Sequence, residues 1–312
     1  KVNKLNIASL KDVLGDMTLS NLLIEELDLS QINFNGNTLT LQCARLNKIV
    51  GPETFNGSLL LLPKSCRLTE FTLEGISNIQ GDFQCKDYSY VKEFVMPFIR
   101  VAGDMTIALN SGSVNTAAEI EFPKLQEIGG TLTLESNSNA NNIAFPSLKK
   151  ILGSCSVTTT DLKNDIEFTN LESIGTDGAD EQIKFEIEAT NILCPKLKTI
   201  NGKFDIATSS FMFGMEVDKV SYPNVESISE NLSITCPYSD FGSNGILSID
   251  FSGLKSAKGI SISGQGDVTD FSSFKYLFEN NVLTGESQWS VKECGYNPTF
   301  QEMKDGKYKL AE

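Results

Sequence analysis

The side chains that could carry out chemistry in this chain are carboxylates and thiols, because its 312 residues include no histidine. Without an imidazole, Ser-His-Asp catalysis, Cys-His catalysis and every zinc site that needs histidine are excluded. Asp161 with Asp165, or Asp177 with Asp180 and Glu181, could supply carboxylates for polysaccharide cleavage. Acidic loop residues are usually only solvated, and the second group lacks the spacing of an EF-hand loop. We therefore predict no catalytic residue, no metal and no cofactor.

Seven cysteines are spread along the chain, and none of them forms a Cys-x-x-Cys pair. That spacing argues against zinc ribbons and thioredoxin-type redox sites. It fits either buried apolar thiols or a few long-range disulfides, and the pairing stays open. The odd number leaves at least one cysteine outside any intrachain disulfide. In chain order they are Cys43, Cys66, Cys85, Cys155, Cys194, Cys236 and Cys294.

Two sequons for N-linked glycosylation provide a second expected modification. Asn-Gly-Ser begins at Asn56 and Asn-Leu-Ser begins at Asn231, so these two asparagines are the predicted acceptors. Sequons together with scattered cysteines favour a protein made in the secretory pathway. The opening residues carry no recognisable signal peptide, and a processed chain is expected. We therefore predict an extracellular location.

The charge balance restricts the kinds of partner. The chain has 40 acidic and 26 basic side chains, which give a net charge of −14. This charge would repel the phosphates of nucleic acid and an anionic membrane surface. No apolar run approaches 18 residues, so we predict no direct insertion into a membrane. Apolar residues make up 40% of the chain, which is enough for a folded core.

A repeated apolar pattern accounts for most of the chain. It reads aromatic-Pro-x-Leu-x-x-Ile-x-Gly-x-Leu-x-Ile, and residues 122–134 are its clearest copy. Successive clear copies begin 23 to 29 residues apart, and looser copies precede them. Their first residues are Phe122, Phe145, Phe168, Cys194, Tyr222 and Phe251. Self-similarity at this period is typical of a solenoid.

The spacing within each copy explains why the copies should stack. The Leu-x-Ile step is the period-two alternation of a short strand with one apolar face. Glycine permits the tight turn between two short strands, and proline forbids a helix after the aromatic residue. One copy cannot bury its own apolar stripe, but stacked copies share a continuous core. We predict a mainly all-β protein, a right-handed parallel β-helix or leucine-rich-repeat-like solenoid with short helical caps.

The ends of the chain differ from the repeats. Residues 1–20 are predicted as an N-terminal cap, because Ser9 starts a capping-box sequence and Leu10, Val13 and Leu14 share a helical face. Residues 21–268 form a continuous solenoid of about ten coils in this prediction. Residues 269–296, with helical spacing in Phe271–Phe278, form a C-terminal cap. The polar residues 297–312 are predicted as a tail.

Longer loops between the repeats are the expected places for binding, since a regular scaffold presents its variable segments there. One loop is apolar, with two phenylalanines and two methionines in residues 211–215, and could face a partner or fold over its own coil. The loops are Asn110–Thr116, Ser136–Asn142, Thr176–Glu181, Ser209–Asp218 and Tyr238–Gly245.

These repeats resemble the receptor L-domain of insulin- and EGF-type receptors. They are more closely similar to fungal GPI-anchored cell-wall glycoproteins that carry such repeats, including spore-wall and sporulation-specific members. The likeness covers roughly residues 20–294 and is most specific over residues 120–262. It implies a cell-surface, GPI-anchored glycoprotein without catalytic activity. It also leaves open two tandem L-domains divided near residues 86–96.

The resemblance bears on the cysteines of the C-terminal cap. The family places a cysteine soon after the aromatic residue of the cap and pairs it with a later one. This chain has Ser273 at that place, which puts the cap disulfide in doubt and makes Cys294 the candidate for the odd cysteine. The other six cysteines stay disulfide candidates with unknown pairing.

Three classes of function follow from these features. The leading hypothesis is a non-enzymatic cell-surface glycoprotein for cell-wall or spore-wall organisation or adhesion, with wall polysaccharide or another surface protein as its partner. The alternative is a receptor-type ectodomain that binds a protein or glycan ligand, which a patch of exposed aromatic residues on one sheet would favour. A polysaccharide-cleaving β-helix enzyme is the third and weakest hypothesis, because base candidates are missing.

Overall fold

The protein is mostly β-structure, with 44% of residues in strands and 7% in helices. Parallel sheets stack as a β-solenoid, which confirms the predicted fold class. The chain forms two compact units, Lys1–Gly153 with Asp161–Thr169 and Ser154–Thr160 with Asn170–Glu312. This computed structural model describes residues 5–62, 70–86, 93–109, 118–136, 140–159, 166–176, 184–188, 192–207, 219–236, 248–266 and 268–311.

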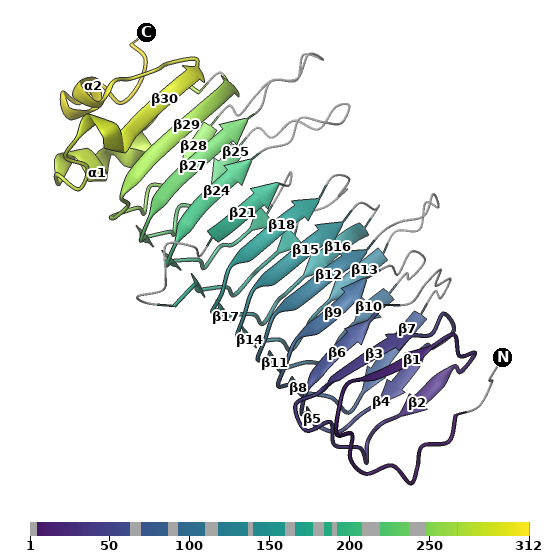
Figure 1. The fold of residues 1–312 in the computed structure, drawn as a ribbon. Helices are drawn as coiled ribbons and strands as arrows, with labels where there is room; N and C mark the ends of the chain where they lie inside the picture. The colour runs from purple at the N-terminus through teal and green to yellow at the C-terminus, as the bar shows by residue number, and fades with distance from the viewer. Residues whose placement is uncertain are drawn as a thin grey trace. The chain divides into compact units, whose positions relative to one another are not determined.

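The first unit has three parallel sheets, here called sheets I, II and III (Figure 1). Sheet I contains β1 (Met17–Ser20), β3 (Thr38–Gln42), β6 (Ser58–Leu61), β9 (Phe83–Lys86), β12 (Met105–Leu109) and β15 (Leu132–Ser136). Sheet II contains β2 (Glu26–Asp28), β4 (Lys48–Val50), β7 (Glu70–Glu74), β10 (Glu93–Val95), β13 (Ala118–Glu121), β16 (Ala140–Ala144) and β19 (Ile166–Glu167). Sheet III contains β5 (Thr54–Phe55), β8 (Asn78–Ile79), β11 (Arg100–Val101), β14 (Glu127–Ile128) and β17 (Lys150–Ile151).

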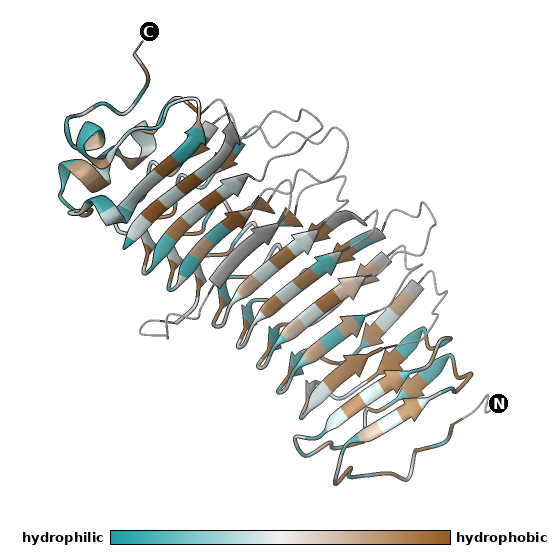
Figure 2. Ribbon diagram, turned by 45° about the horizontal axis from the view of Figure 1, so that its top comes forward, coloured by the Kyte–Doolittle hydropathy of each residue, from teal (hydrophilic) through white to brown (hydrophobic). Residues whose placement is uncertain are grey.

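The alternation of apolar and polar residues along sheet I defines an inner and an outer surface (Figure 2). The inward residues lie in register from strand to strand, so each apolar side chain stacks on its equivalent in the next coil. Five successive members of one inner row are fully buried: Leu39, Leu59, Phe83, Met105 and Leu132. The row continues through every coil because a strand repeats its side-chain direction at every second residue.

The aromatic residues that open the repeats form a second buried row. The ring centroids of Phe122 and Phe145 are 4.9 Å apart, and those of Phe145 and Phe168 are 5.1 Å apart. Both pairs are stacked, and all three side chains are fully buried. The aromatic residues that open these repeats therefore belong to the core.

Polar side chains satisfy the backbone where the chain turns into sheet I. The amide of Asp82 donates to Ser58 Oγ at 2.9 Å, and the amide of Asp104 donates to Asp82 Oδ1 at 2.9 Å. The amide of Thr131 donates to Asp104 Oδ1 at 2.7 Å. Each coil thus supplies the acceptor for a backbone N–H of the next coil, as a buried or half-buried donor requires.

The second unit continues the same repeat. One sheet contains β18 (Cys155–Thr159), β21 (Lys184–Glu188), β24 (Lys203–Ala207), β27 (Asn231–Cys236), β29 (Gly259–Gly266) and β30 (Trp289–Cys294). A second contains β20 (Ser173–Ile174), β23 (Thr199–Ile200) and β26 (Ser227–Ile228). The remaining strands are β22 (Ile192–Leu193), β25 (Lys219–Ser221) and β28 (Ser248–Asp250).

The C-terminal end carries a helical cap. The predicted helix over Phe271–Phe278 is confirmed as the 3-10 turn η1 (Ser272–Phe274) followed by α1 (Lys275–Glu279). Another 3-10 turn, η2 (Glu286–Gln288), precedes β30. The buried ring of Trp289 lies 5.1 Å from that of Phe278, centroid to centroid, and its Nε1–H donates to the carbonyl of Pro298 at 2.9 Å.

The prediction of a polar tail over residues 297–312 was wrong. Helix α2 (Phe300–Lys304) forms there, and Phe300 and Met303 are buried. The ring of Phe300 lies 5.5 Å from that of Phe278. Two apolar residues three positions apart are enough to dock one helical turn on the cap, although the segment is polar on average.

The predicted N-terminal capping helix was also wrong, because residues 5–16 contain no helix. The segment runs alongside the first full coil, with an amide of Val13 donating to the carbonyl of Asn33 at 2.8 Å and that of Asn33 to Lys11 at 2.8 Å. Leu14 is 88% exposed, so the expected apolar helical face is not buried. Pairing with an existing strand avoids the unfavourable nucleation of a very short helix.

Candidate functional site

The outer surface of sheet I spans six parallel strands of the first unit. One row of outward residues crosses all six strands in register. Thr18 is exposed and the others are half-buried, and four of the six side chains are threonines. We call this row the hydroxyl face; its members are Thr18, Thr40, Leu60, Gln84, Thr106 and Thr133.

The outer surface of sheet II is acidic. Glu26, Glu121 and Glu167 occupy positions of one outward row, and Glu119 lies in the neighbouring row. Lys48, Thr72, Val95 and Ala144 occupy the other positions of this row. The charged side chains of this surface are mainly glutamates, which makes it acidic.

Two local contacts modify the electrostatics of sheet II. Lys48 Nζ lies 2.9 Å from Glu74 Oε1, and this hydrogen-bonded partner raises the pKa of the Lys48 ammonium. Hydrogen bonds from Ser30 lower the pKa of the Asp28 carboxyl. Both groups are solvated, so the contacts order the surface without contributing much stability.

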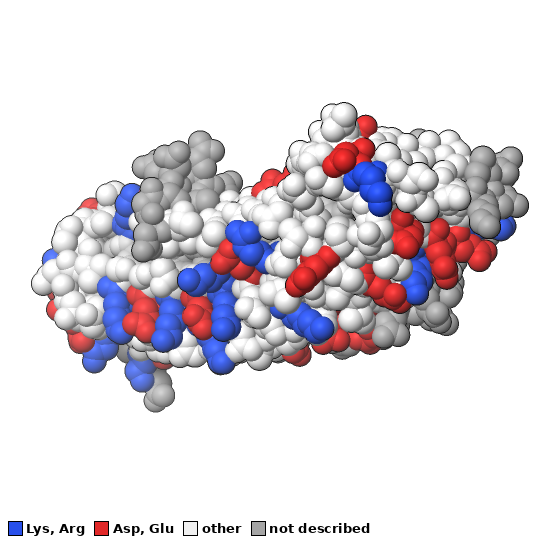
Figure 3. All heavy atoms as spheres, turned by 90° about the horizontal axis from the view of Figure 1, so that it is seen from below, with Lys and Arg blue, Asp and Glu red and all other residues white. Residues whose placement is uncertain are grey.

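The outer surface of sheet III carries both signs of charge. In the first unit Arg100 Nε lies 2.9 Å from Glu127 Oε1. The second unit has a similar surface beside β26, where Lys255 Nζ lies 2.7 Å from Glu226 Oε2 and lowers the pKa of that carboxyl. Basic and acidic side chains accordingly alternate on part of the surface in Figure 3. The charges there largely neutralise one another.

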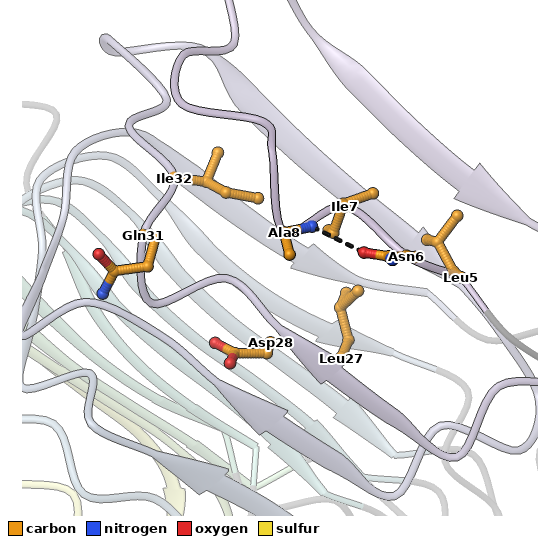
Figure 4. A pocket seen from close by; sticks show the side chains of 8 residues that line it. All are labelled: Leu5, Asn6, Ile7, Ala8, Leu27, Asp28, Gln31 and Ile32. Carbon is orange, nitrogen blue, oxygen red and sulfur yellow. Dashed lines mark hydrogen bonds between the residues drawn. The ribbon is translucent and has the colours of Figure 1, made fainter.

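A hollow of about 270 Å³ lies at the N-terminal end of the first unit (Figure 4). Leu27 and Ile32 form its apolar wall, and Asp28 and Gln31 its polar edge, with residues 5–8 opposite. An amide of Ala8 donates to Asn6 Oδ1 at 3.1 Å and shapes that segment. The volume lies below the usual range of small-molecule sites, so the hollow does not define a ligand site.

Both predicted glycosylation acceptors are exposed. Asn56 lies between β5 and β6, and Asn231 is the first residue of β27. Exposure is the condition that a glycosyltransferase and its bulky product require. Glycosylation itself stays a prediction for both residues.

The cysteines lie mainly in the core. Cys43, Cys155 and Cys194 are buried free thiols, so the buried apolar thiol is the alternative that applies to these three disulfide candidates. Burial raises the pKa of the thiols of Cys155 and Cys194, which keeps them protonated. Cysteine behaves at such inward positions as a small apolar residue, and Cys194 replaces the aromatic residue of its repeat.

The remaining cysteines add little to the candidate site. Cys85 is buried on the inner side of β9, in register with Leu61 and Ile107. Cys294 is half-buried at the end of β30, and its Sγ lies 3.4 Å from the carbonyl oxygen of Lys292. Cys66 and the side chain of Cys236 lie outside the described residues, so their predicted disulfides stay predictions.

The weaker catalytic hypothesis cannot be placed on the structure. Asp161, Asp165, Asp177, Asp180 and Glu181 all lie outside the described residues. The same holds for most of the long loops, including the apolar residues 211–215. Among the residues that the structure does describe, no group of three or more Cys, Asp or Glu side chains could hold a metal ion.

Within the described ranges, none of the helices has the length and hydrophobicity needed to cross a membrane. Comparison with known proteins found no matching family model, no matching curated protein and no matching solved structure. The outer surfaces of sheets I, II and III are therefore the basis for inferring function.

Sequence reasoning missed the hydroxyl face, although the signal was present. The residues between the apolar positions of the first strands are threonine, serine, leucine and glutamine, as in the Thr-Leu-Thr-Leu-Gln sequence of β3. Only the register between strands shows that these residues from different repeats form one continuous row.

Proposed function

We propose that this chain is a non-enzymatic, extracellular glycoprotein of the cell surface that contributes to cell-wall organisation or adhesion by contacting wall polysaccharide. The proposal includes attachment through a GPI anchor in the full-length protein, as the sequence resemblance implies. It also covers the spore wall as a possible setting. A second cell-surface protein is the other partner that this role allows.

The observation that carries the proposal is the extended, regular outer surface of sheet I. A polymer presents the same group at regular intervals, and a solenoid presents equivalent side chains at about 4.8 Å intervals along its axis. Such a surface can make many weak contacts with one long ligand, where a pocket would enclose one small molecule. Two exposed sequons are consistent with a secreted protein.

The receptor-type alternative receives less support from the described surface. A protein-binding face is usually centred on a group of aromatic and other large apolar side chains. The large apolar side chains that are exposed among the described residues are Leu14, Val95, Ile99, Leu193, Tyr276 and Leu310. They come from different parts of the chain and include a single aromatic residue.

The proposal is tested with the secreted, glycosylated protein in a pulldown on insoluble wall glucan, chitin and mannan. Saturable binding to at least one polymer is the expected result. Absence of binding to all three would overturn the wall-polymer role. Mass spectrometry before and after enzymatic removal of N-glycans tests the glycoprotein part, with Asn56→Gln and Asn231→Gln each expected to remove one glycan.

A further inference from the structure

We propose that the hydroxyl face binds a single extended chain of a neutral β-1,4-linked polysaccharide, laid along the axis of the first unit with one sugar per coil. This inference rests on the proposed function and names the ligand class, the surface and the direction of the polymer. The hydroxyl face lies entirely within the first unit.

The absence of charge in the hydroxyl face favours a neutral ligand. The protein carries a net charge of −14, yet the six residues of the hydroxyl face are all uncharged. A neutral ligand meets no unpaired charge there, whereas a charged polymer would lose hydration without gaining an opposite partner. Lys86 and Glu135, in the adjacent row at the ends of their strands, are the nearest charged members of sheet I on that side.

The acidic residues on the other side of the face are already engaged. Asp16 Oδ1 accepts the amide of Thr38 at 2.8 Å. The carboxylates of Asp82 and Asp104 likewise accept backbone amides from the next coil. These contacts hold the carboxylates at the corner of the coil, beside the hydroxyl face and outside its row.

The second argument is the repeat distance. Neighbouring strands in a sheet are about 4.8 Å apart, so six strands place the first and last residues of the row about 24 Å apart. An extended β-1,4-linked chain advances by nearly the same length per sugar, because its linkages are equatorial at both ends. Each coil can therefore lie beside one sugar along the row.

The third argument is the chemistry of the side chains. A pyranose ring has C–H groups on its two faces and hydroxyls at its rim. Thr40, Thr106 and Thr133 each offer a methyl group and a hydroxyl that donates and accepts hydrogen bonds. Leu60 adds apolar surface, and the Gln84 amide supplies two donors and an acceptor. The face thus combines the two kinds of contact that a sugar ring offers.

The other two surfaces of the unit fit this ligand less well. Sheet II would place glutamates against the polymer, and sheet III would place ion pairs such as Arg100–Glu127 against it. A neutral sugar that covers either surface must displace water from charged groups without replacing their interactions. The hydroxyl face is the surface where that cost is smallest.

The experiment measures binding of cello-oligosaccharides and N-acetylated chito-oligosaccharides of increasing length by isothermal titration calorimetry. Affinity should rise with each added sugar and level off near the length of the six-residue row. It should change little with salt, because no ion pair forms. Affinity that is independent of length, or that falls steeply with salt, would overturn the inference.

Three variants locate the surface. Thr106→Glu places a charge in the middle of the hydroxyl face and should weaken binding by about tenfold or more, because the carboxylate loses hydration without a partner. Thr72→Glu makes the same change on the exposed surface of sheet II and should leave affinity unchanged. Thr106→Val keeps the shape, removes the hydroxyl and should weaken binding less. Circular dichroism verifies that each variant is folded.

The outcomes separate the inference from the proposed function. If the unmodified protein binds no wall polymer, both fail. If it binds polymer but Thr106→Glu has no effect, or Thr72→Glu weakens binding equally, only the inference fails. Binding to mannan alone would likewise leave the wall role intact and overturn the assigned ligand class.

Discussion

The buried aromatic row makes a quantitative prediction about how neighbouring coils are coupled. Phe145 stacks on Phe122 at 4.9 Å and on Phe168 at 5.1 Å. A stacked pair contributes about 0.5–1.5 kcal/mol beyond the area that the two rings bury. Phe145→Leu removes both pairs, so we expect about 1–3 kcal/mol from lost stacking, with a further contribution from imperfect packing of leucine.

A double-mutant cycle isolates one of the two pairs. Phe122→Leu and Phe145→Leu, alone and together, should show a coupling free energy of about 1 kcal/mol. The matched control combines Phe145→Leu with Phe55→Leu, because the ring of Phe55 pairs with Phe34 and is buried in another coil. The control pair should be additive within about 0.5 kcal/mol.

Urea unfolding followed by far-ultraviolet circular dichroism measures these free energies, since the signal arises from strands throughout the chain. Fluorescence of the single tryptophan, Trp289, reports separately on the C-terminal cap. The slope of the unfolding free energy against urea must stay constant across the variants for the cycle to be valid. A coupling energy no larger than that of the control pair would refute stacking as a source of cooperation between coils.

Four further results are expected. Gly75→Ala should destabilise the protein more than Gly36→Ala in urea unfolding. Both residues have φ above +80°, but only a Cβ at Gly75 would meet backbone, the Gly51 carbonyl oxygen at 2.3 Å. Equal losses of unfolding free energy would contradict this. Cys155 should resist alkylation until the protein unfolds, because burial raises its thiol pKa; rapid labelling of the folded chain would exclude that. Thr299→Ala should cost about 1 kcal/mol by removing the α2 cap. Hydrogen bonds from Thr299 lower the pKa of the Glu302 carboxyl in the folded protein. The stability that this carboxylate adds is therefore fully present above its unfolded pKa and is lost as the pH falls through the lowered folded pKa. An unfolding free energy that does not change over this acid range would be inconsistent with that contribution.

Much of the fold could be predicted because the apolar spacing within each repeat determines where its strands form and which side chains face inward. The Leu-x-Leu step of residues 132–134 alternates in the way that a half-buried strand must, and β15 forms there. Phe122 and Phe145 each open a clear copy of the repeat, and both are fully buried. These inferences succeed because the side-chain period of a strand is a local property of the backbone.

The ends of the chain were less predictable because they depend on what they pack against. Ser9 and Leu10 begin a sequence compatible with a helix, but the backbone near Val13 pairs with Asn33 instead. Phe300 and Met303 belong to a polar segment and are nevertheless buried by the cap. Local propensity is a weak guide wherever tertiary contacts compete with it.

The candidate site was predictable only in part. The sequons at Asn56 and Asn231 were found from three-residue patterns, and their exposure agrees with that assignment. The redox state of Cys43, Cys155 and Cys194 could not be assigned from their spacing, because a free cysteine and a disulfide-bonded cysteine are identical in the sequence. The structure places them at buried inward positions as free thiols.

The sequence by itself determined a stacked, mainly β-structure protein with a continuous apolar core, because apolar spacing dictates which side chains face inward. Only the tertiary structure decided which outward residues become neighbours. Thr18, Thr40 and Thr106 are far apart in the chain, and their alignment depends on parallel pairing with a fixed register. If the pairing register between two neighbouring strands shifted by one residue, these side chains would turn toward the core and the row would no longer exist.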